Sequence, residues 1–212
     1  MVMSYPVPAN EADRLRALRS YKILDTKPEK RFDELTQLAA LICGVPISLI
    51  SLIDADRQWF KSRFGFDLQQ TPRALAFCTH AIMQPGMFVV PDATQDERFA
   101  QNPLVTGDPH IRFYAGAPLA ARDGHVLGTL CVIDRVPHTL TEAQKEALKI
   151  VGQLVIANFE LRRDLQELKD ALAARDAAKS PSGVPVNLDE IIYRLQGVAS
   201  DLDAVREGRK PS

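Results

Sequence analysis

Apolar residues recur at helical spacing near the start of the chain. An amphipathic segment follows Asn10, a residue type common at helix N-caps, and predicts a short helix within residues 1–20. Apolar positions then recur at helical spacing from about Pro28 to Cys43, after a capping-box pattern at 26–29 and before a glycine stop signal. The chain is therefore expected to open with two helices.

The middle of the chain has the pattern of β-strands joined by tight turns. Runs rich in β-branched residues flank the polar segment 54–57, and a second pair of apolar runs is separated by Asp123 and Gly124. Because hairpins join antiparallel neighbours, the sequence predicts an α+β fold with a largely antiparallel sheet. A helix is expected at 74–83, and the polar segment 92–109 is long enough to be a functional loop.

The longest helical pattern starts at a second capping box, Thr141 and Gln144, and continues to about residue 179. Its apolar positions alternate at spacings of four and three, which predicts a coiled-coil seam. The seam residues are Leu154, Asn158, Leu161, Leu165, Leu168 and Leu172. An Asn158 amide at an a position can pair with its symmetry mate, so a parallel homodimer is expected.

Composition changes near the C-terminal end divide the chain further. Residues 180–186 are a linker by composition, and a new amphipathic stripe with its own cap pattern follows at 187–212. The expected organisation is an N-terminal helix (1–20), a central domain (21–158), a coiled-coil extension of the long helix (159–179), the linker, and a C-terminal helix and tail.

The charge balance and the cysteine usage exclude several classes of protein. The chain has 26 Lys and Arg against 27 Asp and Glu, so it lacks the basic surplus of a nucleic-acid-binding protein. No apolar run approaches the roughly 20 residues that cross a bilayer, and no nucleic-acid or membrane partner is expected. Three widely spaced cysteines suit neither a disulfide framework nor a structural zinc site. A cytoplasmic protein without metal or cofactor is expected.

Four segments give the chain a family resemblance. In order, they are RFDELTQLAALICGVPISLISLIDADRQWFKSRFG, AFCTHAI, VVPDATQDERFAQNPLVTGDPHIRFYAGAPL and GHVLGTLCVID. They resemble the GAF domains that open many bacterial histidine kinases and diguanylate cyclases, over roughly residues 20–165. The resemblance implies a sheet with the terminal helices on one face and with loops and short helices on the other. It also implies a sensory role in intracellular signal transduction, in which a small-ligand pocket or the dimer geometry controls an output.

The sequence departs from these proteins after the central domain. A kinase would continue into a helix that bears a phospho-acceptor histidine, and a cyclase into a Gly-Gly-Asp-Glu-Phe loop, and neither motif occurs here. The output, a kinase or a cyclase by the resemblance, is therefore expected on another chain.

The expected loop and its neighbours supply the candidates for a pocket that binds an unknown small ligand. These candidates are Cys78, His80, Asp96, Phe99, Asn102, Phe113 and Tyr114. Cys78 and His80 lie two residues apart on an expected helix, so their side chains diverge and a shared metal is not expected. Asp96, Arg98 and Arg112 are expected to form a network that orders the loop, because Arg can hold a carboxylate in bidentate fashion.

Two other functions remain open for this pattern. A GAF-type free methionine sulfoxide reductase would attack sulfur with a Cys78 thiolate and resolve the product with a second thiol. That chemistry needs cysteines around one pocket, whereas Cys43 ends a helix and Cys131 lies inside an apolar strand, so both are interpreted as structural. The other alternative is a structural adaptor whose pocket is filled by its own side chains. No catalytic residue is assigned, and the chain is interpreted as non-enzymatic.

Overall fold

Six antiparallel strands form one sheet in the computed structural model, which describes residues 5–179 and side chains up to residue 176. The strands are β1 (Ile47–Ile53), β2 (Arg57–Phe64), β3 (Gln70–Pro72), β4 (Phe88–Val90), β5 (Phe113–Ala120) and β6 (Val126–Asp134). Their spatial order is β3-β2-β1-β6-β5-β4, and both expected hairpins, β1–β2 and β5–β6, are present. β1 also pairs with β6, so these two strands form the centre of the sheet. The predicted α+β class is confirmed.

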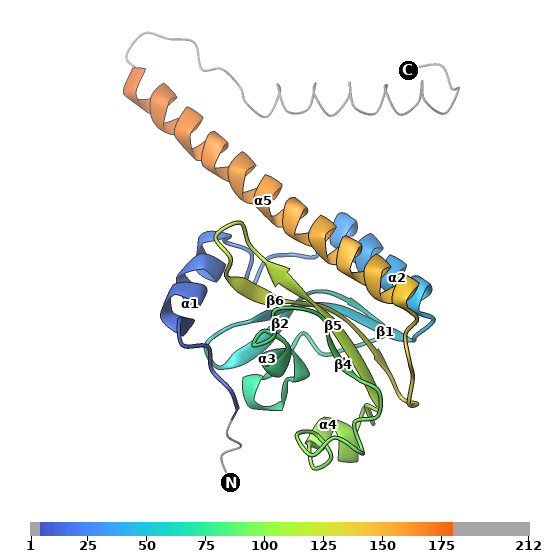
Figure 1. The fold of residues 1–212 in the computed structure, drawn as a ribbon. Helices are drawn as coiled ribbons and strands as arrows, with labels where there is room; N and C mark the ends of the chain where they lie inside the picture. The colour runs from blue at the N-terminus through green and yellow to red at the C-terminus, as the bar shows by residue number, and fades with distance from the viewer. Residues whose placement is uncertain (1–4, 180–212) are drawn as a thin grey trace, which may run out of the picture. The chain divides into compact units, whose positions relative to one another are not determined.

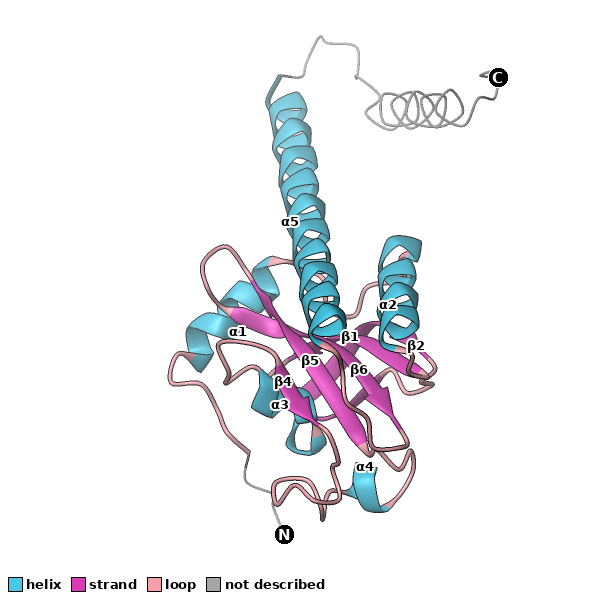
Figure 2. Cartoon of the chain, turned by 45° about the vertical axis from the view of Figure 1, so that its right-hand side comes forward, coloured by secondary structure: helices cyan, strands magenta, loops and turns pink. Residues whose placement is uncertain are grey.

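Helices lie on both faces of the sheet (Figures 1 and 2). One face carries α2 (Lys30–Cys43) and the first part of α5 (Glu142–Lys179), and the other carries α3 (Phe77–Ala81). α1 (Glu11–Ser20) packs against β6, and α4 (Pro103–Thr106) lies within the long loop. The compact domain ends at Leu165, and the residues from Gln166 onward form a second unit. The expected linker at 180–186 and the helix at 187–212 lie outside the described residues.

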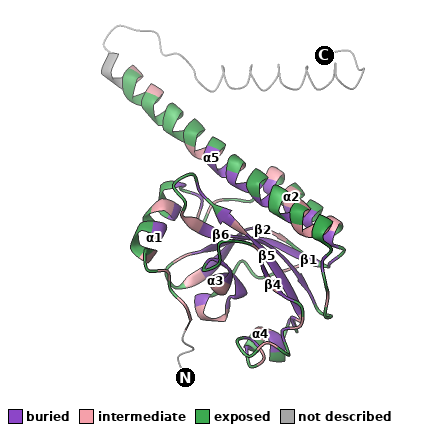
Figure 3. Cartoon of the chain, viewed as in Figure 1, coloured by how far each residue is buried: buried purple, intermediate pink, exposed green. Residues whose placement is uncertain are grey.

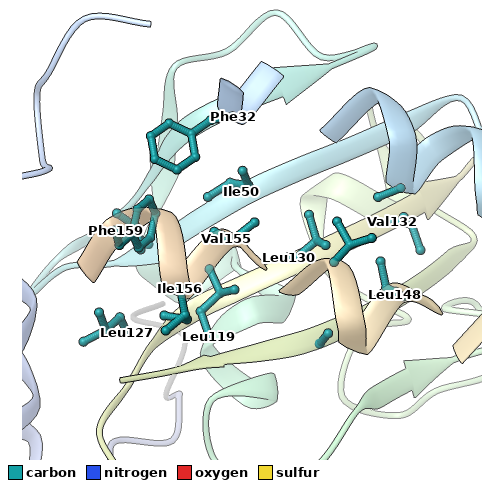
Figure 4. Packing of buried hydrophobic residues seen from close by; sticks show 14 of the residues in the cluster. Phe32, Ile50, Leu119, Leu127, Leu130, Val132, Leu148, Val155, Ile156 and Phe159 are labelled. Atoms are coloured by element: carbon teal, nitrogen blue, oxygen red, sulfur yellow. The ribbon is translucent and has the colours of Figure 1, made fainter. Parts of the chain in front are cut away.

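The sheet separates two hydrophobic cores. The core beneath the helices contains side chains from α2 and α5 and from the facing strands, among them Phe32, Ile50, Val155 and Phe159 (Figure 4). The rings of Phe32 and Phe159 lie 5.1 Å apart and join the two helices. The core on the opposite face contains α3, the long loop and the other side of the strands. The buried apolar side chains of the strands are therefore divided between the two cores.

The ends of the two long helices follow the sequence signals closely. Gly44 ends α2 in the left-handed conformation, with φ at 68°. At the start of α5, the Thr141 N–H donates to Gln144 Oε1 at 2.9 Å and the Gln144 N–H donates to Thr141 Oγ1 at 3.2 Å. The predicted capping box at Thr141 is confirmed by these reciprocal bonds.

Three local expectations need correction. The pattern at 26–29 is not a capping box, because α2 begins only at Lys30 and the Thr26 hydroxyl donates to the Ile23 carbonyl at 2.6 Å. The helix expected at 74–83 is shorter, since the 3-10 turn Arg73–Leu75 precedes the five residues of α3. The strand β3 was not predicted, because three residues carry no measurable periodicity.

Candidate functional site

The candidate site is a group of buried polar side chains around Cys78, on the face of the sheet opposite α2 and α5. Cys78 lies in the first turn of α3, and the Thr79 hydroxyl fixes this turn by donating to the Arg73 carbonyl at 3.0 Å. The apolar side chains of Phe77 and Ala81 seal α3 against the sheet. The Cys78 thiol therefore points into the core, and only 1% of the surface of this residue is exposed.

A second cysteine lies next to Cys78. The sulfur atoms of Cys78 and Cys131 are 3.8 Å apart, although the residues are separated by 53 positions in the sequence. Cys131 lies on the central strand β6, where it is paired with Leu49 of β1 and Gly116 of β5. Cys131, which the sequence analysis interprets as structural, therefore lies beside Cys78, whereas Cys43 lies in the core beneath the helices.

Three hydrogen-bond donors converge on the Cys78 sulfur. Gln58 Nε2 lies 2.9 Å from it, the Thr129 hydroxyl 3.1 Å and the Tyr114 hydroxyl 3.2 Å. The Gln58 amide is held in this orientation because its oxygen accepts a bond from the Thr71 hydroxyl at 2.9 Å. The cluster is thus arranged to stabilise negative charge on sulfur.

This environment changes the acidity of both thiols. Burial by itself raises the pKa of Cys78, but hydrogen bonds from Cys131, Ser51, Thr129 and Tyr114 outweigh it and lower that pKa to about 6. Burial and the neighbouring Cys78 charge raise the pKa of Cys131 well above its usual value. The surroundings therefore favour the thiolate form at Cys78 and the protonated thiol at Cys131.

Gly116 gives Tyr114 the space to reach Cys78. A Cβ atom at Gly116 would lie 2.4 Å from the Tyr114 hydroxyl and 2.9 Å from the ring carbon that bears it. The Tyr114 ring therefore lies over the glycine two positions further along β5. Burial and the Cys78 charge raise the Tyr114 pKa well above its usual value, so the hydroxyl keeps its proton as a donor.

A small cavity adjoins the cluster. Its volume is about 20 Å³, which is enough for one or two water molecules. Cys78, Gln58, Thr71 and Tyr114 line one part of it, and apolar strand and loop side chains line the rest. The described form therefore has no room beside Cys78 for an organic ligand, whose pocket usually measures roughly 300 Å³ or more.

The aromatic candidates divide between the two faces of the sheet. The Phe99 ring stacks on Phe77 with centroids 3.9 Å apart, and His80 meets its edge at 4.9 Å. Burial and the Arg98 charge lower the His80 pKa. Phe113, by contrast, belongs to the core beneath the helices, so its assignment to the pocket is wrong. The alternation of side chains along β5 explains the error, since Tyr114 points to the cluster and Phe113 away from it.

The long loop is ordered without the predicted arginine network. Asp96 and Arg98 form a local ion pair at 2.5 Å, and Arg112 instead donates to the carbonyl groups of Val105 and Ile111 at 2.8 and 3.1 Å. The predicted contact of Arg112 with the Asp96 carboxylate is therefore wrong.

Asn102, another candidate, has a structural role in this loop. Its side-chain oxygen caps α4 by accepting from the Leu104 N–H at 2.9 Å, and its amide donates to the Leu75 carbonyl at 3.0 Å. Asn102 thus fastens the loop to the segment before α3.

Four polar residues of the site were not predicted: Ser51, Gln58, Thr71 and Thr129. Each is a buried polar residue inside or beside a strand, and Ser51 and Thr129 interrupt otherwise apolar runs. A polar residue at a position whose neighbours predict burial is a signal that marks a buried hydrogen-bonded site.

Residues 5–179 contain no group of three His, Cys, Asp or Glu side chains arranged to hold a metal ion. None of the helices in this range combines the length and apolar character that a membrane crossing requires.

Comparison with known proteins assigns the family. A family model of the GAF domain matches residues 27–158, so the chain belongs to the GAF family. The chain is also 43% identical over 198 residues to the cyclic di-GMP phosphodiesterase PA2567 of Pseudomonas aeruginosa. That match covers 93% of this chain and 34% of the relative, so the chain spans about a third of the relative's length. Membership of the GAF family supports a sensory role in signal transduction.

The same relative overturns one interpretation of the sequence. The chain was interpreted as non-enzymatic, whereas the protein that matches nearly all of it is an enzyme. A GAF-type sequence is therefore no reason to exclude an enzyme.

Solved structures share the fold at low sequence identity. The GAF domain of an Acinetobacter phosphoenolpyruvate-protein phosphotransferase is 18% identical with a TM-score of 0.53, over 73% of this chain and 95% of that one. A free methionine-R-sulfoxide reductase from Neisseria meningitidis is 15% identical with a TM-score of 0.53, over 78% of this chain and 99% of that one. These similarities concern the fold alone.

Proposed function

We propose that this chain is the sensory region of a signalling protein that controls the hydrolysis of cyclic di-GMP. The observation that carries the proposal is the 43% identity to a cyclic di-GMP phosphodiesterase over 93% of this chain. The match leaves about two thirds of the relative uncovered, and we place the hydrolytic site in that part. The GAF region would then set the rate of hydrolysis, in place of the kinase or cyclase output expected from the sequence. The three free cysteines suit a cytoplasmic protein.

The route from the Cys78 cluster to α5 passes through β2. Successive residues of a strand point to opposite faces, and Gln58 belongs to the Cys78 cluster whereas Lys61 points toward the helices. The Lys61 ammonium donates to the Glu29 carboxylate at 2.7 Å, and Arg162 of α5 donates to the same carboxylate oxygen at 3.1 Å. Glu29 therefore joins the strand to the helix that leads out of the domain.

We also propose that the output depends on a parallel homodimer formed through α5. Figure 3 shows exposed positions along α5. Within the compact domain, the exposed positions of this helix include four large apolar residues, Ile150, Leu154, Leu161 and Leu165. Leu38 and Leu41 of α2 are also exposed, at 43% and 69%. A second copy of the chain would remove these leucines from water.

A chimera tests the proposed function. This chain would replace the aligned third of the Pseudomonas aeruginosa relative, and the hydrolysis of cyclic di-GMP would be measured with Glu29 intact and with Glu29→Gln. We expect the chimera to hydrolyse cyclic di-GMP and the variant to change its rate at least threefold, because the link between β2 and α5 is weakened. Glu34→Gln, which alters an exposed pair on α2, is the matched control.

Two outcomes would contradict the proposal. The first is a rate of hydrolysis that stays the same when Glu29→Gln is introduced and when the GAF region is deleted. This result would show that the region does not control hydrolysis. Turnover of cyclic di-GMP by this chain alone would place the active site within it.

One observation favours the methionine sulfoxide reductase alternative, namely the adjacent thiols of Cys78 and Cys131. The cavity beside them opposes it, because about 20 Å³ is far smaller than a free amino acid. An NADPH-coupled thioredoxin assay on free methionine sulfoxide distinguishes the two functions. Turnover that is abolished by Cys78→Ser would establish the reductase.

A further inference from the structure

We propose that Cys78 is a modification site for small hydroperoxides, and that Cys131 converts the oxidised Cys78 into a disulfide. The proposal rests on the buried cluster itself and does not depend on the link to cyclic di-GMP. Its test therefore succeeds or fails separately from the test of the proposed function.

Three hydrogen-bond donors surround the Cys78 sulfur. The Gln58 amide and the hydroxyls of Thr129 and Tyr114 lie within 3.2 Å of this atom. A thiol used only for packing needs no such donors, since a buried cysteine behaves as a small hydrophobe. These donors stabilise the thiolate, which is the nucleophilic form of cysteine.

The position of Cys131 also supports the proposal. Its sulfur is 3.8 Å from that of Cys78, and a disulfide bond is about 2.05 Å long. The two sulfurs must therefore approach each other by less than 2 Å. Cys78 lies on a five-residue helix followed by turns, so α3 can make this movement more easily than the central strand β6.

The cavity beside Cys78 limits the size of the oxidant. Cys78 lines a space of about 20 Å³, and so do Leu104 and Pro109 of the long loop and Ile111, which follows it. Hydrogen peroxide is small and uncharged, and it is only one oxygen atom larger than a water molecule, of which this space can hold one or two. Bulky or charged thiol reagents are excluded unless the loop opens.

The reaction balances with the peroxide as the only oxidant. The Cys78 thiolate attacks one peroxide oxygen, so that the S–O bond forms, the O–O bond breaks, and the leaving hydroxide takes a proton to become water. Cys131 then attacks the Cys78 sulfur, so that the S–S bond forms and the S–O bond breaks. The departing hydroxide takes the Cys131 proton and leaves as a second water. Two thiols thus give two electrons to one peroxide, and a dithiol reductant reverses the change.

Cys43 provides an internal control in the same chain. It is buried in the core beneath α2 and α5, and burial raises its pKa to about 11. Cys43 therefore reports the reactivity of a buried thiol that lacks the donor cluster.

The experiment exposes the folded full chain to hydrogen peroxide, quenches it, and alkylates the remaining thiols after unfolding. Mass spectrometry then reports each cysteine separately. We expect Cys78 and Cys131 to be lost together as one disulfide, at least about tenfold faster than Cys43 is oxidised. The rate should fall about tenfold for each pH unit below 6, because the Cys78 thiolate is protonated there.

Two variants test the assigned roles. Cys131→Ser should leave Cys78 as a sulfenic acid, which dimedone traps, and should form no intramolecular disulfide. Thr129→Val removes one donor and should slow the oxidation of Cys78, whereas Cys43→Ser should leave its rate unchanged. If Cys78 and Cys43 are oxidised at the same rate in the unmodified chain, the proposal is wrong. This outcome does not depend on how the variants behave. Loss of Cys78 without its disulfide to Cys131 would overturn the role of Cys131.

Discussion

At the scale of single residues, the Cys78 cluster stabilises a buried charge with neutral donors instead of a cation. An unpaired charge in an apolar interior is costly, and the protein compensates this one with an amide, two hydroxyls and a neighbouring thiol. A lysine or arginine beside Cys78 would need desolvation of its own. Neutral donors therefore favour the Cys78 thiolate without a buried cation.

Gly116→Ala tests the precision of this arrangement. The new methyl group would overlap the Tyr114 hydroxyl, so the ring must move and the bond to Cys78 at 3.2 Å is lost. We expect the Cys78 pKa to rise by about one unit and the protein to lose roughly 1–3 kcal/mol of stability. Thiolate absorbance against pH measures the first effect, and urea unfolding measures the second.

Gly86→Ala is the control for this prediction, because nothing lies within 4 Å of a Cβ atom at Gly86. Both readouts should stay unchanged there. An unaltered Cys78 pKa in Gly116→Ala would show that the Tyr114 hydroxyl does not stabilise the thiolate.

The residues of the site were only partly predictable from the sequence. Cys78 and Tyr114 stand out by their chemistry, but the contact between Cys78 and Cys131 joins α3 to the central strand and leaves no local pattern. Arg112 was assigned a carboxylate partner, because a sequence does not show that nearby carbonyl groups satisfy the guanidinium first. Side-chain partners across a fold depend on register, which the composition of a loop does not specify.

At the scale of secondary-structure elements, Glu29 is the point where β2, α2 and α5 meet. Burial raises its pKa, but hydrogen bonds from Lys61 and Arg31 outweigh this and lower the pKa to about 2. The contribution of this carboxylate to stability is present above its usual pKa of about 4.3 and is lost as the pH falls toward 2.

Glu29→Gln should therefore lower the unfolding free energy at pH 7 by about 1–3 kcal/mol, with allowance for the partial exposure of the side chain. The difference from the unmodified chain should shrink between about pH 4.5 and pH 2. Urea unfolding at several pH values measures it.

Glu34→Gln breaks only the exposed pair with Lys30 and should change stability by less than about 1 kcal/mol at any pH. A Glu29→Gln difference that does not depend on pH would contradict the proposed charge network.

The elements themselves were largely predictable. The two hairpins, α2 and α5 were recognised because long runs with a clear period and a glycine or capping-box signal dominate their sequences. The failures are short elements, such as β3 and α3, whose structure depends on neighbours in space. Tertiary packing, and not local propensity, determines these segments.

At the scale of the whole molecule, the proposed dimer makes α5 the element that passes a change in the sensory domain to an output. In the single chain, the Asn158 amide donates to the Leu154 carbonyl at 2.8 Å, one turn earlier. In a parallel pair this amide could instead bond to its copy across the seam. In such a pair the exposed leucines form the interface. A change in the sensory domain would then alter how the two α5 helices pack against each other.

The double variant Leu161→Glu, Leu165→Glu should convert the dimer into monomers, because charges replace leucines that are 52% and 47% exposed in the single chain. Sedimentation velocity at micromolar concentration measures the change. Gln153→Glu, on an exposed position of the same helix, should have no effect.

Asn158→Leu should remain associated but lose strict two-stranded, parallel pairing. A monomeric unmodified chain would contradict the dimer. Crosslinks between Leu154→Cys and Leu172→Cys would indicate an antiparallel pair instead.

The sheet also affects how such a protein can evolve. Substitutions around Cys78 alter the core that contains α3. The core beneath α2 and α5 is a separate one, and it contains Phe32, Trp59 and Phe159. A descendant could therefore exchange Gln58 or Thr129 without repacking the core beneath α2 and α5. Under the proposed function, the domain could in this way acquire a new chemical input in small mutational steps while the helices and their output are kept.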